Sequence, residues 1–252
     1  MSLAIRLREK IQAACSPVLD FIYPPLCRSC GVTIHPDDIL CANCMGDLPE
    51  LEWDERHAEV ILSQLHVPFS AEHVRVGYFF ENSGVLQQCI HAMKYQEMHS
   101  IAKWFGRLLG ERLVGTPFID GDPMLVPVPL HKMKYYERGY NQSEWLCKGI
   151  AFETGLAMHT KLLTRTRYTK SQAASKLDAD ERQANVKNAF MIDGSGANTH
   201  PTSVILVDDL ITTGATTSEC IAALNAGGIS DVRVLALASP IRMEITDYRF
   251  EM

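Results

Sequence analysis

The sequence predicts an α/β protein in which a parallel β-sheet is flanked by helices and preceded by a small cysteine-rich segment. From residue 125 onward, apolar segments alternate with helical ones, which is typical of a parallel sheet. Two of these segments, 204–207 and 232–237, are nearly uninterrupted apolar runs, as expected of strands buried on both faces. Four of the eight cysteines lie between residues 27 and 44, which sets that segment apart.

The composition is that of an ordinary globular protein. Of the 252 residues, 46% are hydrophobic and 21% are charged, which excludes a largely disordered, collagen-like or mucin-like chain. No stretch approaches the ~18 uncharged apolar residues of a membrane span. The first 30 residues have no apolar run followed by a small-residue cleavage site. We therefore expect no membrane insertion and a cytoplasmic location.

The N-terminal region predicts a separate small unit. Leu3, Leu7, Ile11 and Ala14 recur at helical spacing and predict an amphipathic helix that ends before Pro17. An acidic, poorly periodic stretch over residues 48–59 follows the cysteines, and together with Val67-Pro68 it has the character of a connector. We expect residues 1–60 to hold the helix and the cysteine segment, and residues 70–252 to form the main domain.

Within the expected main domain, the sequence predicts strands and helices in a regular order. Residues 74–80 indicate a strand, 82–84 a turn, and 85–95 and 101–114 two helices. Further strands are expected at 125–128, 162–163, 204–207 and 232–237. Helices are expected after Asn141 and after Gly214.

The most informative segment joins the apolar run 204–207 to a helix. Asp208 and Asp209 come first, followed by Thr212, Thr213, Gly214, Ala215 and Thr216. A helix N-terminus, threonine hydroxyls and a close-approaching glycine backbone suit a phosphate. Two carboxylates repel phosphate but suit ribose hydroxyls or a magnesium ion. An acidic N-cap on an ordinary helix is the plainer alternative, although capping needs one aspartate and no threonine-rich loop.

This segment resembles the motif that binds phosphoribosyl pyrophosphate (PRPP) in type I phosphoribosyltransferases. Pro127-Val-Pro-Leu-His131, Arg138-Gly-Tyr-Asn-Gln-Ser143 and the later Gln172, Arg182, Asn185, Val186 and Ala189-Phe190 extend the match. Together they resemble the ComF/GntX family of competence-associated, phosphoribosyltransferase-like proteins. The resemblance implies a type I phosphoribosyltransferase fold, a structural N-terminal zinc ribbon, magnesium bound with PRPP, and a link to DNA uptake.

The same resemblance implies roles for residues of the site. Asp208 and Asp209 would contact the ribose, and residues 212–216 would hold the 5′-phosphate. Lys132 and Lys134, in a predicted basic loop after a strand, are candidates for the pyrophosphate. Arg165 joins the two aspartates as a catalytic candidate and opens a polar segment, ending near Arg182, that predicts a lid. Each basic residue could instead be a solvated surface charge.

Positive charge gathers where this anionic ligand would bind. Residues 131–190 hold 11 Lys or Arg and 6 Asp or Glu, whereas the whole chain has a net charge of −6. The chain is therefore not a protein whose entire surface binds nucleic acid. The strings of a Walker A loop and of a dinucleotide-binding loop are both absent from the sequence.

The cysteine spacing predicts a metal site. Cys27-x2-Cys30 and Cys41-x2-Cys44 are two pairs of the kind that close a tetrahedral zinc site, which leaves no open position for catalysis. Redox-active dithiols and simple packing are the alternatives. Cys15, Cys89, Cys147 and Cys220 lie in apolar helical contexts and are expected to be buried.

Two functions follow. The first is transfer of phosphoribosyl from magnesium-bound PRPP to an acceptor that the sequence does not identify. The second is a non-catalytic PRPP sensor of the competence machinery that binds single-stranded DNA. The DNA would contact basic residues interleaved with Tyr135, Tyr136, Tyr140 and Tyr168, and other competence proteins would be partners.

Overall fold

The computed structural model describes residues 24–64, 70–95, 98–166, 189–192 and 201–240. The chain divides into two compact units, Met1–Leu48 and Pro49–Met252. The predicted N-terminal helix and Cys15 lie outside the described residues, as do Tyr168 and the segment predicted as a lid beyond residue 166. Helix α3 (Glu55–Gln64), which falls in the stretch expected to be a connector, buries Ala58 and Ile61 within the second unit.

The described part of the first unit, residues 24–48, is short and rich in turns. A β-bridge joins Leu26 to Thr33, and α2 (Ala42–Gly46) follows. The Sγ of Cys41 caps this helix by accepting a hydrogen bond from the backbone N–H of Cys44.

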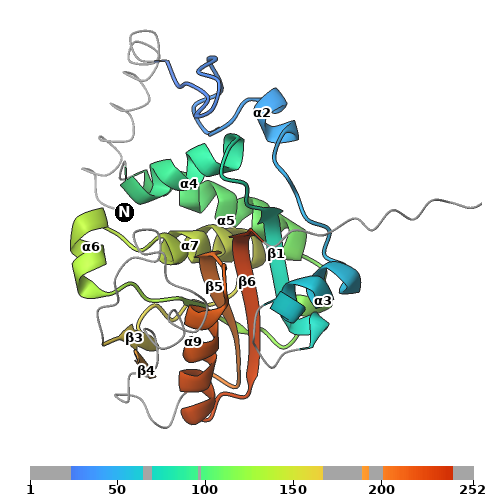
Figure 1. Cartoon of the computed structure of the whole chain (residues 1–252), viewed down its shortest axis with the longest axis vertical. Coiled ribbons are helices and arrows are strands. Elements are labelled where there is room, and N and C mark those ends of the chain that lie inside the picture. The colour runs from blue at the N-terminus through green and yellow to red at the C-terminus, as the bar shows by residue number, and fades with distance from the viewer. Residues whose placement is uncertain (1–23, 65–69, 96–97, 167–188, 193–200, 241–252) are drawn as a thin grey trace, which may run out of the picture. The chain divides into compact units, whose positions relative to one another are not determined.

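A four-stranded parallel sheet forms the centre of the second unit. Its strands are β1 (Val74–Phe79), β2 (Met124–Pro127), β5 (Ser203–Leu210) and β6 (Asp231–Ser239), in the spatial order β1-β6-β5-β2 (Figure 1). In the register, Val207 of β5 pairs with Pro127 on one side and with Leu235 on the other. The predicted parallel sheet is thereby confirmed.

The sheet is buried because helices cover it. Residues 204–207 are fully buried, as the apolar run predicts. Helices α5 (His99–Leu113) and α7 (Gln142–Thr154) pack closely on each other, and α7 packs on β2 and β5. The two helices approach so closely that a Cβ at Gly106 would overlap the carbonyl oxygen of Leu146, and one at Gly149 that of Lys103. Helix α9 (Ala215–Ala226) packs on β6.

Two features differ from the sequence prediction. Residues 162–163 were expected to belong to the parallel sheet, but β3 (Leu163–Arg165) instead pairs antiparallel with β4 (Phe190–Ile192) in a sheet of two strands. The prediction of a basic loop after β2 is wrong, because the residues concerned form the helix α6 (Lys132–Arg138). His131 Nδ1 accepts from the backbone N–H of Met133 at the start of α6, and Gly139 ends the helix with a φ of 74°.

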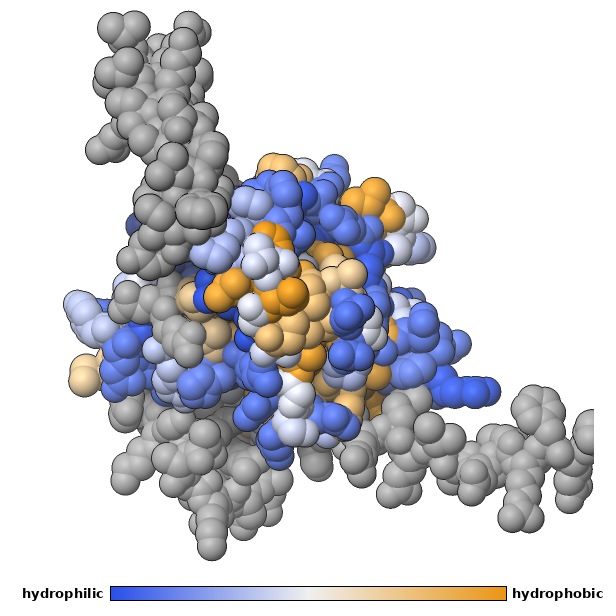
Figure 2. Space-filling model, turned by 90° about the horizontal axis from the view of Figure 1, so that it is seen from above, coloured by the Kyte–Doolittle hydropathy of each residue, from blue (hydrophilic) through white to orange (hydrophobic). Residues whose placement is uncertain are grey.

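The surface carries exposed apolar side chains. On the face seen in Figure 2, hydrophobic residues lie at the surface among hydrophilic ones. Large hydrophobic side chains exposed in the second unit include Tyr95, Val114, Met133, Tyr135, Tyr136, Phe152 and Met191. Among the helices that the structure describes, none has the length and apolarity needed to cross a membrane.

Candidate functional site

The acidic pair lies at the carboxyl end of β5, where ligands of open parallel sheets bind. Asp208 is 8% exposed, and its Oδ1 accepts from the backbone N–H of Asp209 at 2.9 Å and from the hydroxyl of Ser143 at 3.4 Å. Burial and the neighbouring charge of Asp209 raise the pKa of Asp208 to about 7, although these hydrogen bonds and the charge of Lys94 oppose the rise. Asp208 is thus a carboxyl group that exchanges its proton near physiological pH.

Asp209 is held by a lysine from a distant part of the chain. Lys94 Nζ lies 3.2 Å from Asp209 Oδ2, and both side chains are less than one-fifth exposed. Lys94 belongs to the last turn of α4 (Val85–Tyr95), so the ion pair connects that helix to the end of β5. Reasoning from the sequence did not assign Lys94 to the site.

The segment over residues 138–143 supports both aspartates. The hydroxyl of Tyr140 and the side-chain amide of Gln142 both donate to the carbonyl oxygen of Met93, the residue before Lys94. Arg138 Nη1 in turn donates to Gln142 Oε1 at 3.0 Å. Ser143 contacts Asp208 directly. The contacts of these side chains therefore position the residues that carry charge.

Asn141 fixes the start of α7. Its side-chain oxygen accepts from the backbone N–H of Ser143 at 3.1 Å, as an N-cap does, and its amide nitrogen donates to the carbonyl of Val128 at 3.0 Å. This bond holds α7 at the end of β2. The N-cap role of an asparagine directly before a helix could have been predicted from the sequence.

The threonine-rich loop forms a small hollow beside the acidic pair. Gly214 has a φ of 72°, a conformation that favours glycine, and it is the N-cap of α9 without any side-chain cap recorded there. The backbone N–H groups of the first turn therefore have no acceptor within the helix. The hydroxyl of Thr213 is buried and has no hydrogen-bond partner among the described residues. The hollow is lined by Asp208, Leu210, Ile211, Thr212, Thr213, Gly214, Ala215, Thr216 and Thr217.

Positive charges gather near the acidic pair. Burial lowers the pKa of Lys134 on α6, and the charges of Arg165, Arg138 and Lys94 lower it further, while Asp209 opposes them. Burial also lowers the pKa of Arg165 on β3, against the charges of Cys220 and Asp208. The Arg165 guanidinium lies 5.1 Å from the centre of the Phe190 ring. The structure thus brings Lys134 and Arg165 to the acidic pair, whereas Lys132 is exposed at the start of α6.

The four predicted metal ligands lie together in the first unit. The Sγ atoms of Cys27, Cys30, Cys41 and Cys44 all lie within 4.8 Å of one another, and those of Cys30 and Cys41 are 3.6 Å apart. A tetrahedral zinc ion with bonds of ~2.3 Å separates its sulfur ligands by about 3.8 Å, so the cluster fits zinc.

The thiols of this cluster titrate unequally. Burial raises the pKa of Cys27, but hydrogen bonds from the backbone of Cys30, Cys41 and Ser29 outweigh it and lower the pKa to about 6. At Cys44 a hydrogen bond with Ser29 lowers the pKa, yet burial and the other three thiols raise it to about 12. Holding all four groups as thiolates at neutral pH would therefore require a cation. By contrast, the predicted packing cysteines of the second unit, Cys89, Cys147 and Cys220, are fully buried in the core.

Comparison with known proteins identifies relatives over most of the chain. No family model matches. The DNA utilization protein YhgH of Salmonella typhi is 29% identical over 215 residues, which cover 84% of this chain and 83% of that protein. Competence protein F of Haemophilus influenzae is 28% identical, over 85% of this chain and 84% of that protein. Competence protein ComFC of Streptococcus pneumoniae is 31% identical, over 44% of this chain and 46% of that protein.

Solved structures overlap this chain only in part. A hypoxanthine phosphoribosyltransferase from Trypanosoma cruzi with ternary substrates is 10% identical, with a TM-score of 0.31 over 62% of this chain and 88% of that one. A second structure of the enzyme from that organism is 12% identical, with a TM-score of 0.33 over 59% and 69%. The fold described above therefore rests on the strand order of this chain itself. The relatives confirm the resemblance read from the motifs: over most of its length the chain is similar to competence protein F and to the DNA utilization protein YhgH.

Proposed function

We propose that the carboxyl edge of the sheet binds PRPP and that the chain transfers its phosphoribosyl group to an acceptor. The observation that carries this proposal is the placement of an acidic pair, less than one-fifth exposed, directly beside the N-terminus of α9, which has no side-chain cap. One side of this edge suits the diol of a ribose and the other suits a phosphate ester. A ribose 5-phosphate presents both groups at once.

The phosphate would contact the loop over residues 212–216. Its oxygens can accept from the first backbone N–H groups of α9, where the helix dipole favours negative charge. The buried hydroxyl of Thr213 supplies a further donor that has no partner in the described residues. The hollow itself has a volume of about 20 Å³, so the phosphate would bind at its mouth.

The ribose would contact the aspartates. A carboxylate accepts hydrogen bonds, and the two hydroxyls of a ribose diol can each donate one. Asp209 forms an ion pair with Lys94, and Asp208, whose pKa is raised, needs to lose its proton to accept fully. Ligand binding is then coupled to the deprotonation of Asp208.

The leaving diphosphate would lie near Lys134 and Arg165. Burial and the charges of Arg165, Arg138 and Lys94 lower the pKa of Lys134, and an incoming anion would relieve this repulsion. The carboxylate oxygens of Asp208 and Asp209 also suit magnesium, which when bound would neutralise charge on the diphosphate as the bond at C1 breaks. Lys134 and Arg165 then stabilise the charge that develops on the departing group.

Release of pyrophosphate tests the transferase function. With magnesium and PRPP, the chain should release pyrophosphate when a library of bases and amines is offered, and Asp208→Asn should abolish the release. A Glu81→Gln variant, which neutralises an exposed carboxylate outside the site, should retain it. Release that persists in Asp208→Asn would contradict the proposal.

A second candidate function is PRPP-regulated binding of single-stranded DNA, in line with the names of the relatives. Tyr136 is 81% exposed and Tyr135 is 47% exposed on α6, beside the exposed Lys132. Aromatic rings next to basic residues suit base stacking and phosphate contact. Tyr140 is buried and bonded to Met93, so it does not belong to this surface.

The DNA surface has its own test. Tyr136→Ala should weaken binding of a fluorescent oligothymidine about 5- to 150-fold, because stacking contributes ~1–3 kcal/mol per base. Binding should also weaken steeply as salt increases. Phe152→Ala, which removes a 66% exposed ring from α7, should bind as wild type does. Equal losses in the two variants, or a flat salt response, would exclude α6 as the DNA surface.

We further propose that the four-cysteine cluster binds one structural zinc ion and that the protein is cytoplasmic, where buried thiols stay reduced. Cys27→Ser should lower the zinc content from about one per chain to well below it, and should unfold the first unit, whose folding energy the metal would supply. Cys147→Ala removes a buried thiol far along the chain and should keep the zinc. Elemental analysis measures both, and full zinc in Cys27→Ser would disprove the site.

A further inference from the structure

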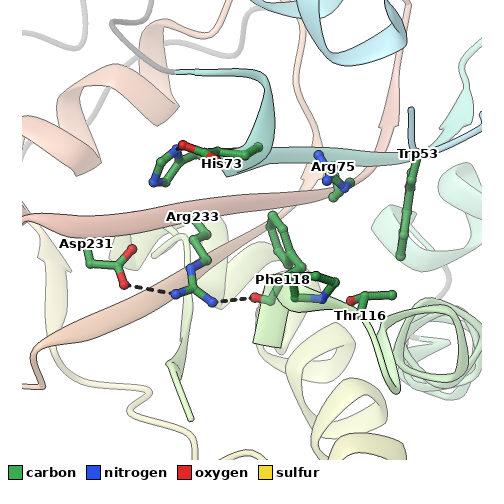
Figure 3. Close-up of a pocket in the computed structure, with 9 residues that line it drawn as sticks. Trp53, His73, Arg75, Thr116, Phe118, Asp231 and Arg233 are labelled. Carbon is green, nitrogen blue, oxygen red and sulfur yellow. Dashed lines mark hydrogen bonds and ion pairs between the residues drawn. The ribbon is translucent and has the colours of Figure 1, made fainter. Parts of the chain in front are cut away.

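A second cavity lies at the opposite edge of the sheet from the acidic pair. It has a volume of about 510 Å³, in the ~300–1,000 Å³ range of small-molecule pockets. Figure 3 shows its lining, which comes from the starts of β1 and β6, from the segments before β1 and β2, and from Trp53. Because the strands are parallel, the amino ends that line this cavity lie away from the carboxyl end that holds Asp208. The lining residues are Trp53, Glu72, His73, Arg75, Thr116, Pro117, Phe118, Asp231 and Arg233.

Aromatic walls of the cavity are held in place. The indole N–H of Trp53 donates to the carbonyl of Val76 at 2.8 Å, and the Arg112 guanidinium lies 4.1 Å from the centre of the indole ring. Phe118 is 4% exposed and follows the turn that begins at Thr116. Fixed aromatic rings provide flat apolar surface at little entropic cost, which suits a planar ligand.

Most of the charged side chains that line the cavity already have partners within the protein. Arg233 donates from Nη1 to the carbonyls of Phe118 and Asp120, and its Nη2 lies 3.0 Å from Asp231 Oδ2 (Figure 3). Glu72 accepts from the hydroxyl of Ser70 at 3.0 Å, and its side chain is 77% exposed. These side chains therefore form the wall of the cavity, and few of their hydrogen-bonding atoms remain for a ligand.

Arg75 is the exception. Both of its recorded hydrogen bonds leave from Nη1, to the carbonyls of Ala71 and Val74, and no carboxylate of the described residues forms an ion pair with it. Its guanidinium lies 5.3 Å from the centre of the Phe118 ring. Burial lowers the pKa of Arg75 and the charge of Glu72 only partly compensates. A guanidinium that lines a cavity with Nη2 and Nε available favours an anion, which it can hold with two parallel hydrogen bonds.

We propose that this cavity binds a small planar ring that carries one anionic group, a carboxylate or a phosphate. The anionic group pairs with Arg75, and the ring packs along Trp53 and Phe118. Such a ligand would bind at the amino ends of the strands, independently of PRPP at their carboxyl ends.

Calorimetry on the full chain tests this with 4-aminobenzoate and phenyl phosphate as the two anionic probes, neither of which carries a ribose, and with aniline, phenol and inorganic phosphate as their separate parts. We expect saturable binding of at least one anionic probe, at least about 10-fold tighter than either part alone. The probe that binds decides between carboxylate and phosphate. Fluorescence of Trp53, left as the single tryptophan in Trp104→Phe/Trp145→Phe, should change with the same affinity and place the ligand.

Two substitutions with opposite signs complete the test. Arg75→Gln should weaken binding about 10-fold or more, and Glu72→Gln, at an exposed position, should strengthen it because it removes a repelling charge. Asp208→Asn should leave the binding unchanged, which separates this cavity from the PRPP site. If neither probe binds at about 10 mM, or if Glu72→Gln and Arg75→Gln bind as wild type does, the proposal is wrong.

Discussion

Replacing Asp208 by asparagine is expected to raise the melting temperature of the chain at pH 8. The fold raises the pKa of this carboxyl from 3.8 to about 7, chiefly through burial and the charge of Asp209. The neutral carboxyl of Asp208 thus contributes its full stabilisation below about pH 4, and this stabilisation is lost as the pH rises through 7. Asparagine avoids the buried charge and keeps an oxygen that can accept from Ser143 and from the backbone of Asp209.

The gain should be several degrees at pH 8 and small at pH 4, since ~1 kcal/mol corresponds to about 2–4 °C in a chain of this size. Thermal unfolding followed by circular dichroism at the two pH values measures it. Asp54→Asn is the control of opposite sign, because the backbone N–H of His57 and its ring lower the pKa of Asp54. That variant should lose stability at pH 8. An Asp208→Asn variant that melts below wild type at pH 8 would show that the carboxylate stabilises the fold.

Lys134→Met is expected to weaken the binding of magnesium-bound PRPP about 10-fold or more, because a charged hydrogen bond contributes ~1.5–3 kcal/mol. The reason is its position among Arg165, Arg138 and Lys94, where burial and their charges lower its pKa. Removing one of these repelling charges should not lower the melting temperature. The matched control is Lys132→Met on the same helix, whose side chain is exposed.

Titration calorimetry of both variants, with salt held constant, measures the effect. The structure predicts a loss in Lys134→Met alone. Equal losses in the two variants would mean that the helix acts only through its general charge, and a loss in Lys132→Met alone would reverse the assignment.

The apolar pattern of the sequence predicted the fold well, because the burial of apolar side chains determines which segments become core strands and helices. The run 204–207 is fully buried and the predicted helix over residues 85–95 is confirmed to the residue as α4. The residues 162–163 were misplaced because a short apolar pair does not specify its partner, and here β3 pairs with the distant β4. The helix α6 was missed because its start depends on a histidine cap, which is not among the usual capping residues.

Within the candidate site, local motifs were easier to predict than long-range contacts. The acidic pair and the threonine-rich loop are consecutive in the chain, so their neighbourhood around the start of α9 follows from the sequence. The pair between Lys94 and Asp209, and the bonds of Tyr140 and Gln142 to Met93, connect segments that only the tertiary fold brings together. Spacing along the chain carries no information about such contacts.

Calorimetric titration of magnesium-bound PRPP into wild type and into Asp208→Asn/Asp209→Asn tests the central claim most directly. The paired carboxylates are proposed to hold the ribose, so wild type should bind one PRPP per chain and the double variant should lose at least about 100-fold in affinity. The folded state of the double variant is checked by its melting temperature. Equal affinity in the two proteins would contradict the assignment of this edge of the sheet to a ribose phosphate.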